Sequence, residues 1–108
     1  MNGLKKIEAT RQLLVKQGVV GNRGTAQTFT LPSTASFGDK ICVIQKGAGN
    51  ITIAQNAGQT IHWLDIDTTT GATGSVTSTL QWSTLCLLCI TANTDWVVID
   101  NEGNWDLV

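Results

Sequence analysis

The sequence predicts an all-β domain, an antiparallel β-sandwich or barrel-like module with a short N-terminal helix or strand. Three observations lead to this prediction. The chain has 108 residues, which suffices for one hydrophobic core but not for two. Only 14% of its residues are charged, while it contains 16 threonines and 11 glycines, a composition that favours strands and turns. Apolar or β-branched runs recur about every ten residues between turn signals, as in sandwiches and barrels.

The N-terminal segment is the one candidate helix. Four leucine and isoleucine side chains in residues 2–17 recur near helical spacing, and polar residues fill the other side. Gly18 is expected to end this helix. Residues 12–16 alone fit a short strand equally well, so helix and strand both stay open. We therefore divide the chain into an N-terminal helical or connecting segment, 1–18, and a β-rich domain, 19–108.

After the N-terminal segment, apolar and β-branched runs alternate with turns. The first run ends at a proline, and turns that contain glycine and asparagine separate the next three runs. A Gly- and Thr-rich stretch precedes the longest run, and Asn-containing turns bound the last two runs. We expect strands at residues 26–31, 40–45, 50–54, 60–64, 85–91, 96–100 and 105–108.

Three of these runs are apolar on both faces of a strand, unlike residues 50–54, which alternate as a half-exposed strand does. They are Ile41–Ile44, Leu85–Ile90 and Trp96–Ile99. A sandwich of this size has one inner layer, so the second face of these strands needs another cover. We expect a neighbouring subunit in a closed, rotationally symmetric assembly to supply it. Cover by loops and the N-terminal segment is the alternative.

Charge is divided unevenly along the chain. All seven basic residues precede residue 47, together with two acidic ones, whereas six acidic residues and no base follow. This excludes a uniformly basic nucleic-acid binder, because the acidic half would repel a phosphate backbone or an anionic membrane surface. No apolar stretch approaches the ~20 residues of a membrane span, and residues 1–6 lack the apolar core of a signal peptide. We expect no nucleic-acid partner and no membrane insertion.

Cysteine usage indicates synthesis in a reducing cytoplasm. The three cysteines, Cys42, Cys86 and Cys89, are odd in number and lie in apolar runs, so we expect no disulfide framework. Cys86 and Cys89 match a redox CxxC spacing, but on a strand they point to opposite faces, about 10 Å apart, which is beyond disulfide reach. We interpret them as small buried hydrophobic residues.

No catalytic or metal centre is predicted from the other residues. His62 is the only histidine, and we interpret it as a half-exposed strand histidine; a metal site formed by three copies around a threefold axis is the alternative. Asp65–Gly71 opens like a calcium loop but has Thr70 and Val76 where that loop needs glycine and glutamate, so we interpret it as a polar loop. We predict neither an enzyme nor a cofactor.

The four tryptophans are the strongest candidates for ligand contact, because the chain has no tyrosine and two phenylalanines. Trp82 follows a Thr/Ser-rich loop and Trp105 follows a turn, so both are expected to be partly exposed. Trp63 and Trp96 are expected in the core or in subunit contacts. The candidate ligand surface joins the first two to the loop from Asp65 to Thr79, and its residues are Trp82, Trp105, Asp65, Asp67 and Thr69.

Several blocks of the sequence resemble a known family in their order along the chain. They are Thr28–Pro32, Gly38–Asp39, Lys46–Gly49, Ile53–His62, Thr68–Gly71, Gly74–Ser75, Cys89–Val98 and Gly103–Trp105. Over about residues 12–108 the chain resembles the C-terminal module of tail-fibre proteins of tailed phages and prophages. The resemblance implies a compact β module at a fibre tip, usually a homotrimer, that recognises a host surface. It brings no catalytic residues, and at Trp63–Ile66 the chain departs from the shorter, glycine-containing stretch of related sequences.

The combined expectation is a non-enzymatic, homotrimeric tail-fibre tip domain of a phage or prophage virion, assembled in the host cytoplasm. Its partners would be copies of itself and a host cell-surface glycan or protein. A purely structural trimerisation or capping module of a fibre is the alternative, and a small hydrolase, for which no nucleophile and base are assembled, is the third. If the N-terminal half faces the shaft, the acidic half lies toward the distal tip and favours neutral glycans over anionic ones.

Overall fold

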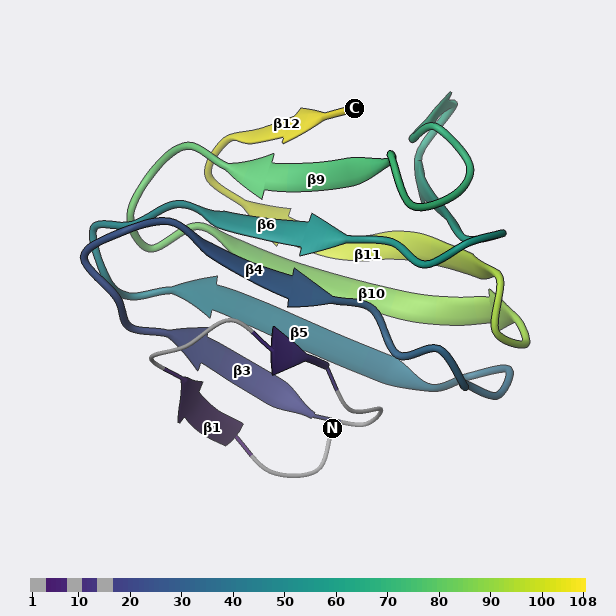
Figure 1. Ribbon diagram of the computed structural model, residues 1–108, viewed down its shortest axis with the longest axis horizontal. Helices are drawn as coiled ribbons and strands as arrows, with labels where there is room; N and C mark the ends of the chain where they lie inside the picture. Colours follow the sequence, from purple (N-terminus) through teal and green to yellow (C-terminus); the bar gives the residue numbers. More distant parts are fainter. Residues whose placement is uncertain (1–3, 8–10, 14–16) are drawn as a thin grey trace.

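Two β-sheets face each other in the computed structural model, which describes residues 4–7, 11–13 and 17–108 (Figure 1). Within these residues there is no helix, and hence none long and apolar enough to cross a membrane, and the predicted all-β class is confirmed. The large sheet contains, in order across its width, β1 (Leu4–Ile7), β3 (Gly18–Gly21), β5 (Lys40–Gln45), β10 (Thr84–Thr91), β11 (Asp95–Glu102), β7 (Thr60–Trp63) and β8 (Ile66–Asp67). The small sheet contains β12 (Trp105–Leu107), β9 (Ser75–Ser78), β6 (Ile51–Ala54), β4 (Gln27–Thr30) and β2 (Arg11–Gln12).

Both sheets are mixed rather than purely antiparallel, which corrects the sequence expectation. From β3 to β6 the chain alternates between the two sheets, so each strand lies beside the strand before last and runs parallel to it. Antiparallel pairing dominates in the later strands, as between β10 and β11 and between β9 and β12. Regular turn spacing predicts strands, but it does not distinguish a hairpin within one sheet from a crossover to the other.

The strands β3 to β6 form two stacked coils in register. Gly18 of β3 pairs with Cys42 of β5, and the same offset of 24 residues relates β4 to β6 in the small sheet. The turns that connect the sheets stack equally closely, because a Cβ atom added at Gly49 would collide with the backbone of Thr25. A side chain is therefore excluded where the two turns meet.

The described residues of the N-terminal segment include two strands, and strand is one of the two forms that the sequence left open. Leu4–Ile7 form β1, parallel to β3, and Arg11–Gln12 form β2, parallel to β4. Leu13 is 1% exposed in the core, and its backbone N–H donates to the carbonyl oxygen of Thr30 (2.7 Å). Pairing with both sheets and burial of Leu13 outweigh a weak helical period. The N-terminal segment thus contributes to both sheets, while residues 14–16 lie outside the described part of the chain.

The strands predicted after the N-terminal segment are confirmed as β4, β5, β6, β7, β10, β11 and β12, β5 with the predicted ends and the others with shifted ends. The prediction lacks β3, β8 and β9. β3 has glycine at both ends, and β9 is rich in serine and threonine, so neither has the composition of an apolar strand. β8 is only 2 residues long.

The hydrophobic core lies between the two sheets. Its largest side chains include Trp96 and Phe29, both 0% exposed. The other buried apolar residues come from both sheets and their connections: Leu13, Val19, Leu31, Ala35, Ile41, Val43, Ile51, Ile53, Ile61, Val76, Leu85, Leu87, Cys89 and Trp105. Trp63 is half-buried and packs against this core. Trp63 and Trp96 therefore both contact the core, as expected.

The centre of the large sheet is apolar on its outer face as well. The three two-sided runs of the sequence are β5, β10 and β11, which are neighbours in this sheet. Their outward side chains and one from β3 form what we call the outer apolar face: Val20, Cys42, Ile44, Cys86, Leu88, Ile90, Val97 and Ile99. Ile90 and Ile99 are 42% and 45% exposed, so the described residues cover this face only in part.

A disulfide joins Cys42 of β5 to Cys86 of β10, which corrects the expectation that the chain has none. The two cysteines are direct partners in the antiparallel ladder, and their Cα atoms are 4.1 Å apart. Sequence spacing does not reveal this pair, because 44 residues separate its members. Cys89 is buried and free, as expected, and burial raises the pKa of its thiol.

The oppositely charged halves of the sequence lie side by side rather than at the two ends of the molecule. In the large sheet, the basic residues are on β1 and β5 and the acidic residues on β11 and β8, with β10 between them. The acidic half spans the length of β11, from Asp95 to Glu102. The expected placement of the acidic half toward a distal tip stays a prediction.

Candidate functional site

A network of buried amide side chains holds the loops at one end of the sandwich. Gln55, 3% exposed, follows β6. Its Nε2 atom lies within hydrogen-bond distance of the carbonyl oxygens of Gln59 (2.6 Å), Thr69 (3.0 Å) and Gly71 (3.0 Å). Gln55 thus fastens the loop before β9 to the connection between β6 and β7.

Gln59, 1% exposed, extends the network to two further loops. Its Nε2 atom donates to the carbonyl oxygens of Pro32 (2.8 Å) and Asn93 (3.1 Å). The side-chain oxygen of Asn93 in turn accepts from the backbone N–H of Ala35 (2.8 Å). Anchoring of loops accounts for these residues without any ligand.

His62 of β7 lies between two carboxylates on the outer side of the large sheet. Its Nδ1 atom is 2.7 Å from Oδ1 of Asp67 on β8, and its Nε2 atom is 2.9 Å from Oδ1 of Asp95 on β11. The His62 side chain is 33% exposed, so the predicted half-exposed strand histidine is confirmed. The bond to Asp95, followed by the bond to Asp67, raises the pKa of His62. The same bond lowers the pKa of Asp95.

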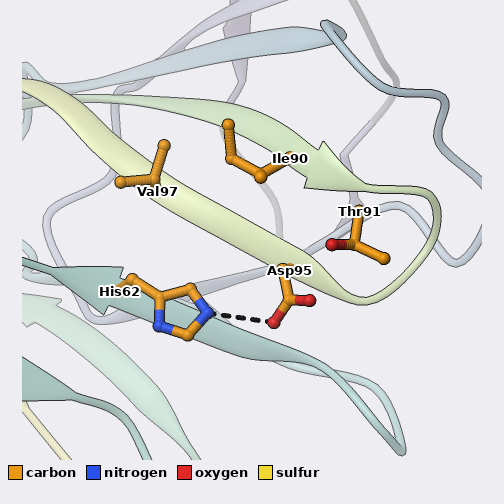
Figure 2. A pocket seen from close by; sticks show the side chains of 5 residues that line it. All are labelled: His62, Ile90, Thr91, Asp95 and Val97. Carbon is orange, nitrogen blue, oxygen red and sulfur yellow. Dashed lines mark hydrogen bonds and ion pairs between the residues drawn. The ribbon is translucent and has the colours of Figure 1, made fainter.

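An open pocket of about 460 Å³ lies beside this histidine (Figure 2). It is lined by His62, Ile90, Thr91, Asp95 and Val97, from β7, β10 and β11. Figure 2 shows Ile90 and Val97 on the apolar side of the pocket, and Asp95 and His62 joined by their hydrogen bond. The pocket is continuous with the outer apolar face, because Ile90 and Val97 belong to both.

The chemistry of this pocket favours binding. Each imidazole nitrogen of His62 already faces a carboxylate oxygen, so neither is left to activate a nucleophile. Thr91 adds a hydroxyl group, and Ile90 and Val97 add apolar surface. Among the described residues, no group of three or more His, Cys, Asp and Glu side chains is placed to hold a metal ion. A metal site shared by three copies of His62 stays a prediction.

Trp82 is exposed, as the sequence predicts, and its backbone is strained. The side chain is 61% exposed, and φ of Trp82 is 69°, in the left-handed region that favours glycine. A non-glycine residue pays about 1–2 kcal/mol for this conformation. The last residue of β5 and the residue after it fix the loop, because the carbonyl oxygen of Gln45 accepts from Trp82 N–H (2.6 Å) and that of Lys46 accepts from Gln81 Nε2 (2.7 Å).

Trp105 is 8% exposed and belongs to the core, so its expected exposure is wrong. Pairing of β12 with β9 carries it inward, and its Nε1 atom donates to the carbonyl oxygen of Glu102 (3.2 Å). Asp65, Asp67 and Thr69 are exposed. They lie on or beside β8, whereas Trp82 lies in the connection from β9 to β10 at the other end of β9 (Figure 1). The structure therefore does not gather the predicted ligand residues into one site.

The β7–β8 hairpin carries an exposed apolar tip that the predicted site residues leave out. Leu64 is 87% exposed and has φ of 55°, and Ile66 is 59% exposed. The preceding Trp63 packs against the core and fixes the base of the hairpin. A positive φ favours glycine, so leucine is an unusual residue at position 64. The run Trp63–Leu64–Asp65–Ile66, with apolar residues in a turn, is the feature of the sequence that could have indicated this tip.

Comparison of the sequence with protein-family models yields no match, and comparison with curated proteins yields none either.

Proposed function

We propose that the chain is a non-enzymatic tip module of a phage or prophage tail fibre, which forms a homotrimer and binds a host cell-surface glycan. The main observation that supports this proposal is the outer apolar face. Three neighbouring strands with apolar side chains on both faces are typical of a sheet that packs against a partner. The resemblance to tail-fibre modules supports a partner that is another copy of the chain.

Two strained, exposed apolar residues support a role in surface recognition. Trp82 and Leu64 both have positive φ and both project into solvent. Strain of this kind persists only where the surrounding structure imposes it, and it is often found at binding sites. Tryptophan presents a flat apolar ring and one hydrogen-bond donor, which suits stacking on a sugar. Repetition of such a contact in three copies would convert weak single-site binding into avidity.

A binding experiment with matched aromatic variants tests this role. The probe is an array of bacterial surface polysaccharides, neutral and anionic, incubated with the full chain. Trp82→Ala is expected to weaken binding at least about tenfold, as loss of a central aromatic contact does. Phe37→Ala is the control, because Phe37 is 77% exposed and has no positive φ. Equal binding of the wild type and Trp82→Ala would contradict the role of Trp82.

A structural capping module is the second candidate, and the stacked coils favour it. Coils in register, as in β3 to β6, extend by stacking a further coil on an open edge. Such a module would associate stably without contacting a receptor. Competition between the purified chain and intact phage particles for host cells separates the candidates, because only a receptor-binding module reduces attachment of the particles.

A further inference from the structure

Charge in the large sheet is separated across its width. The strands on one side of β10 carry the basic residues Lys5, Lys6 and Lys40, and those on the other side carry the acidic residues Asp67, Asp95, Asp100 and Glu102. The sequence of β10 itself, from Thr84 to Thr91, contains no charged residue. An apolar centre thus has a basic half on one side and an acidic half on the other.

Strand register places the positions of Lys6, Lys40 and the four acidic residues on the same face as the apolar centre, whereas Lys5 is in register with Val19 of the core and belongs to the other face. Lys40 is in register with Leu88, and Leu88 with Val97. Val97 is in register with His62, and His62 with Asp67. Directly paired residues share one face of a sheet. One row across the sheet therefore runs from a lysine through two apolar residues to the carboxylate that holds His62.

A second row of the sheet has the same order of charge. It runs through the register positions of Lys6, Val20, Ile44, Thr84 and Glu102. Asp100, next to this row, is in register with Cys86 and is exposed, as is Glu102. Both rows begin at a lysine position, cross a centre of apolar or hydroxylated residues and end at an acidic residue, which in the first row is preceded by His62.

The outer face of the small sheet is different, and this distinguishes the two faces. Its half-buried outward residues are mostly hydroxylated: Thr28, Thr30, Thr52, Ser75 and Thr77. Thr52 and Thr77 bond to each other through their hydroxyl groups (3.0 Å). Hydroxyl groups can hydrogen-bond to water, so this face requires no apolar partner. The large sheet is therefore the side that a partner covers.

We infer that the outer apolar face binds a second copy of the chain with opposite halves in contact, so that the basic half of one copy lies on the acidic half of the next. A second copy of the chain has a basic half, an apolar centre and an acidic half, so its surface is complementary in charge to the outer apolar face of the first copy. An unrelated partner would need the same three features in the same order. The pocket beside His62 then lies on the acidic side of the contact. This inference rests on the proposed self-association and adds which halves meet.

Charge reversal on each half tests the inference. The acidic-half variant is Asp100→Lys with Glu102→Lys, and the basic-half variant is Lys6→Glu with Lys40→Glu. The combined variant carries all four changes, so its basic half becomes acidic and its acidic half becomes basic. The control is Asp106→Lys with Arg23→Glu, which reverses one charge of each sign outside the large sheet and, like the combined variant, leaves the net charge unchanged. Self-association is measured by sedimentation velocity, and circular dichroism verifies the β-fold of each variant.

Each half-variant is expected to weaken self-association at least about tenfold at low salt, because like charges then meet. The weakening should shrink at about 1 M salt, where charges are screened beyond about 3 Å. The combined variant should recover most of the wild-type affinity, and the control should retain it. Association of both half-variants as tight as that of the wild type, or failure of a folded combined variant to recover, would overturn the inference.

Cross-linking of the wild-type chain tests the same contact without any substitution. A mixture of ¹⁵N-labelled and unlabelled chains is treated with a carbodiimide, which couples a lysine to a carboxylate in direct contact. Links between copies should join Lys6 or Lys40 to Asp100 or Glu102, and links confined to other residues would overturn the inference. A monomeric wild type would refute the proposed homotrimer together with this contact. A wild-type trimer that is indifferent to the reversals would refute the contact alone.

Discussion

The Nε2 atom of His62 lies 2.9 Å from Oδ1 of Asp95, and this bond ties β7 to β11 on the acidic side of the outer apolar face. The other imidazole nitrogen faces Asp67 of β8 at 2.7 Å. Protonated histidine donates from both nitrogens, so the folded chain favours the imidazolium form. His62 thereby holds together three strands at this side of the large sheet.

The bond between His62 and Asp95 predicts a pH-dependent stability. The pKa of His62 is raised above 6.5, so its contribution is full below pH 6.5 and is lost as the pH rises through the raised pKa. The pKa of Asp95 is lowered below 3.8, so its contribution is present above pH 3.8 and is lost as the pH falls through the lowered pKa. Urea unfolding should therefore show His62→Gln to be less stable than the wild type by about 0.5 kcal/mol at about pH 5 and by less at about pH 9. An equal difference at both pH values would contradict the ion pair.

Replacement of Gln59 by an apolar side chain of the same length should lower the free energy of unfolding, because its hydrogen bonds are lost. Gln59→Met keeps the length of the side chain but leaves the carbonyl oxygens of Pro32 and Asn93 without their donor. A buried acceptor left unsatisfied costs about 1–3 kcal/mol, and the bond to Asn93 is only partly buried, so urea unfolding should show a loss of about 2–4 kcal/mol. Gln81→Met is the control, because the bond of Gln81 to Lys46 is exposed. A similar, small loss in both variants would argue against the network as an anchor.

The disulfide between Cys42 and Cys86 predicts a selective pattern of thiol labelling. In the oxidised, folded chain, alkylation should modify none of the three cysteines, because Cys89 is buried. Unfolding without reductant should expose Cys89 alone. Reduction should also lower the free energy of unfolding by about 2–4 kcal/mol, as expected for a bond that closes a long loop. Labelling of all three cysteines in the unfolded, unreduced chain would show that the bond is absent.

The close contact of the two stacked turns predicts a position-specific effect of alanine. In Gly49→Ala the new Cβ atom meets the backbone of Thr25, so the turns must separate, at a cost of about 1–3 kcal/mol. Gly24→Ala is the matched control, since nothing lies within 4 Å of its Cβ position. Its effect should stay within about 0.5 kcal/mol. Thermal unfolding of the two variants measures the contrast, and equal melting temperatures would contradict the stacking of the coils.

Much of the fold was predictable from local pattern. Alternation and apolar runs located β4 to β7 and β10 to β12, and the two-sided runs proved to be neighbours in the large sheet. β3 was missed because glycine bounds it, although its Val19–Val20 pair stacks in register on Val43–Ile44 of the next coil. The parallel direction of these coils depends on crossovers between sheets, which turn residues do not encode.

Less of the candidate site was predictable, because its parts are distant in sequence. Asp95 is 33 residues from His62 and reaches it only through the parallel pairing of β7 with β11. Exposure of Trp82 followed from its polar neighbours, whereas Trp105 follows a similar turn and is buried by pairing of β12. The charge division was evident in the sequence, but only the strand order of the large sheet sets the two signs on opposite sides of β10.

The central claim is that the outer apolar face joins copies of this chain, and sedimentation equilibrium tests it most directly. The wild type is expected at three times the chain mass of 11.5 kDa. Ile99→Lys, which places a charge on the outer apolar face, is expected to shift the chain to monomer. Leu80→Lys, at a residue that is 56% exposed outside this face, should leave the trimer intact. A wild type that is monomeric at every concentration, or a trimer that Ile99→Lys does not weaken, would contradict the account.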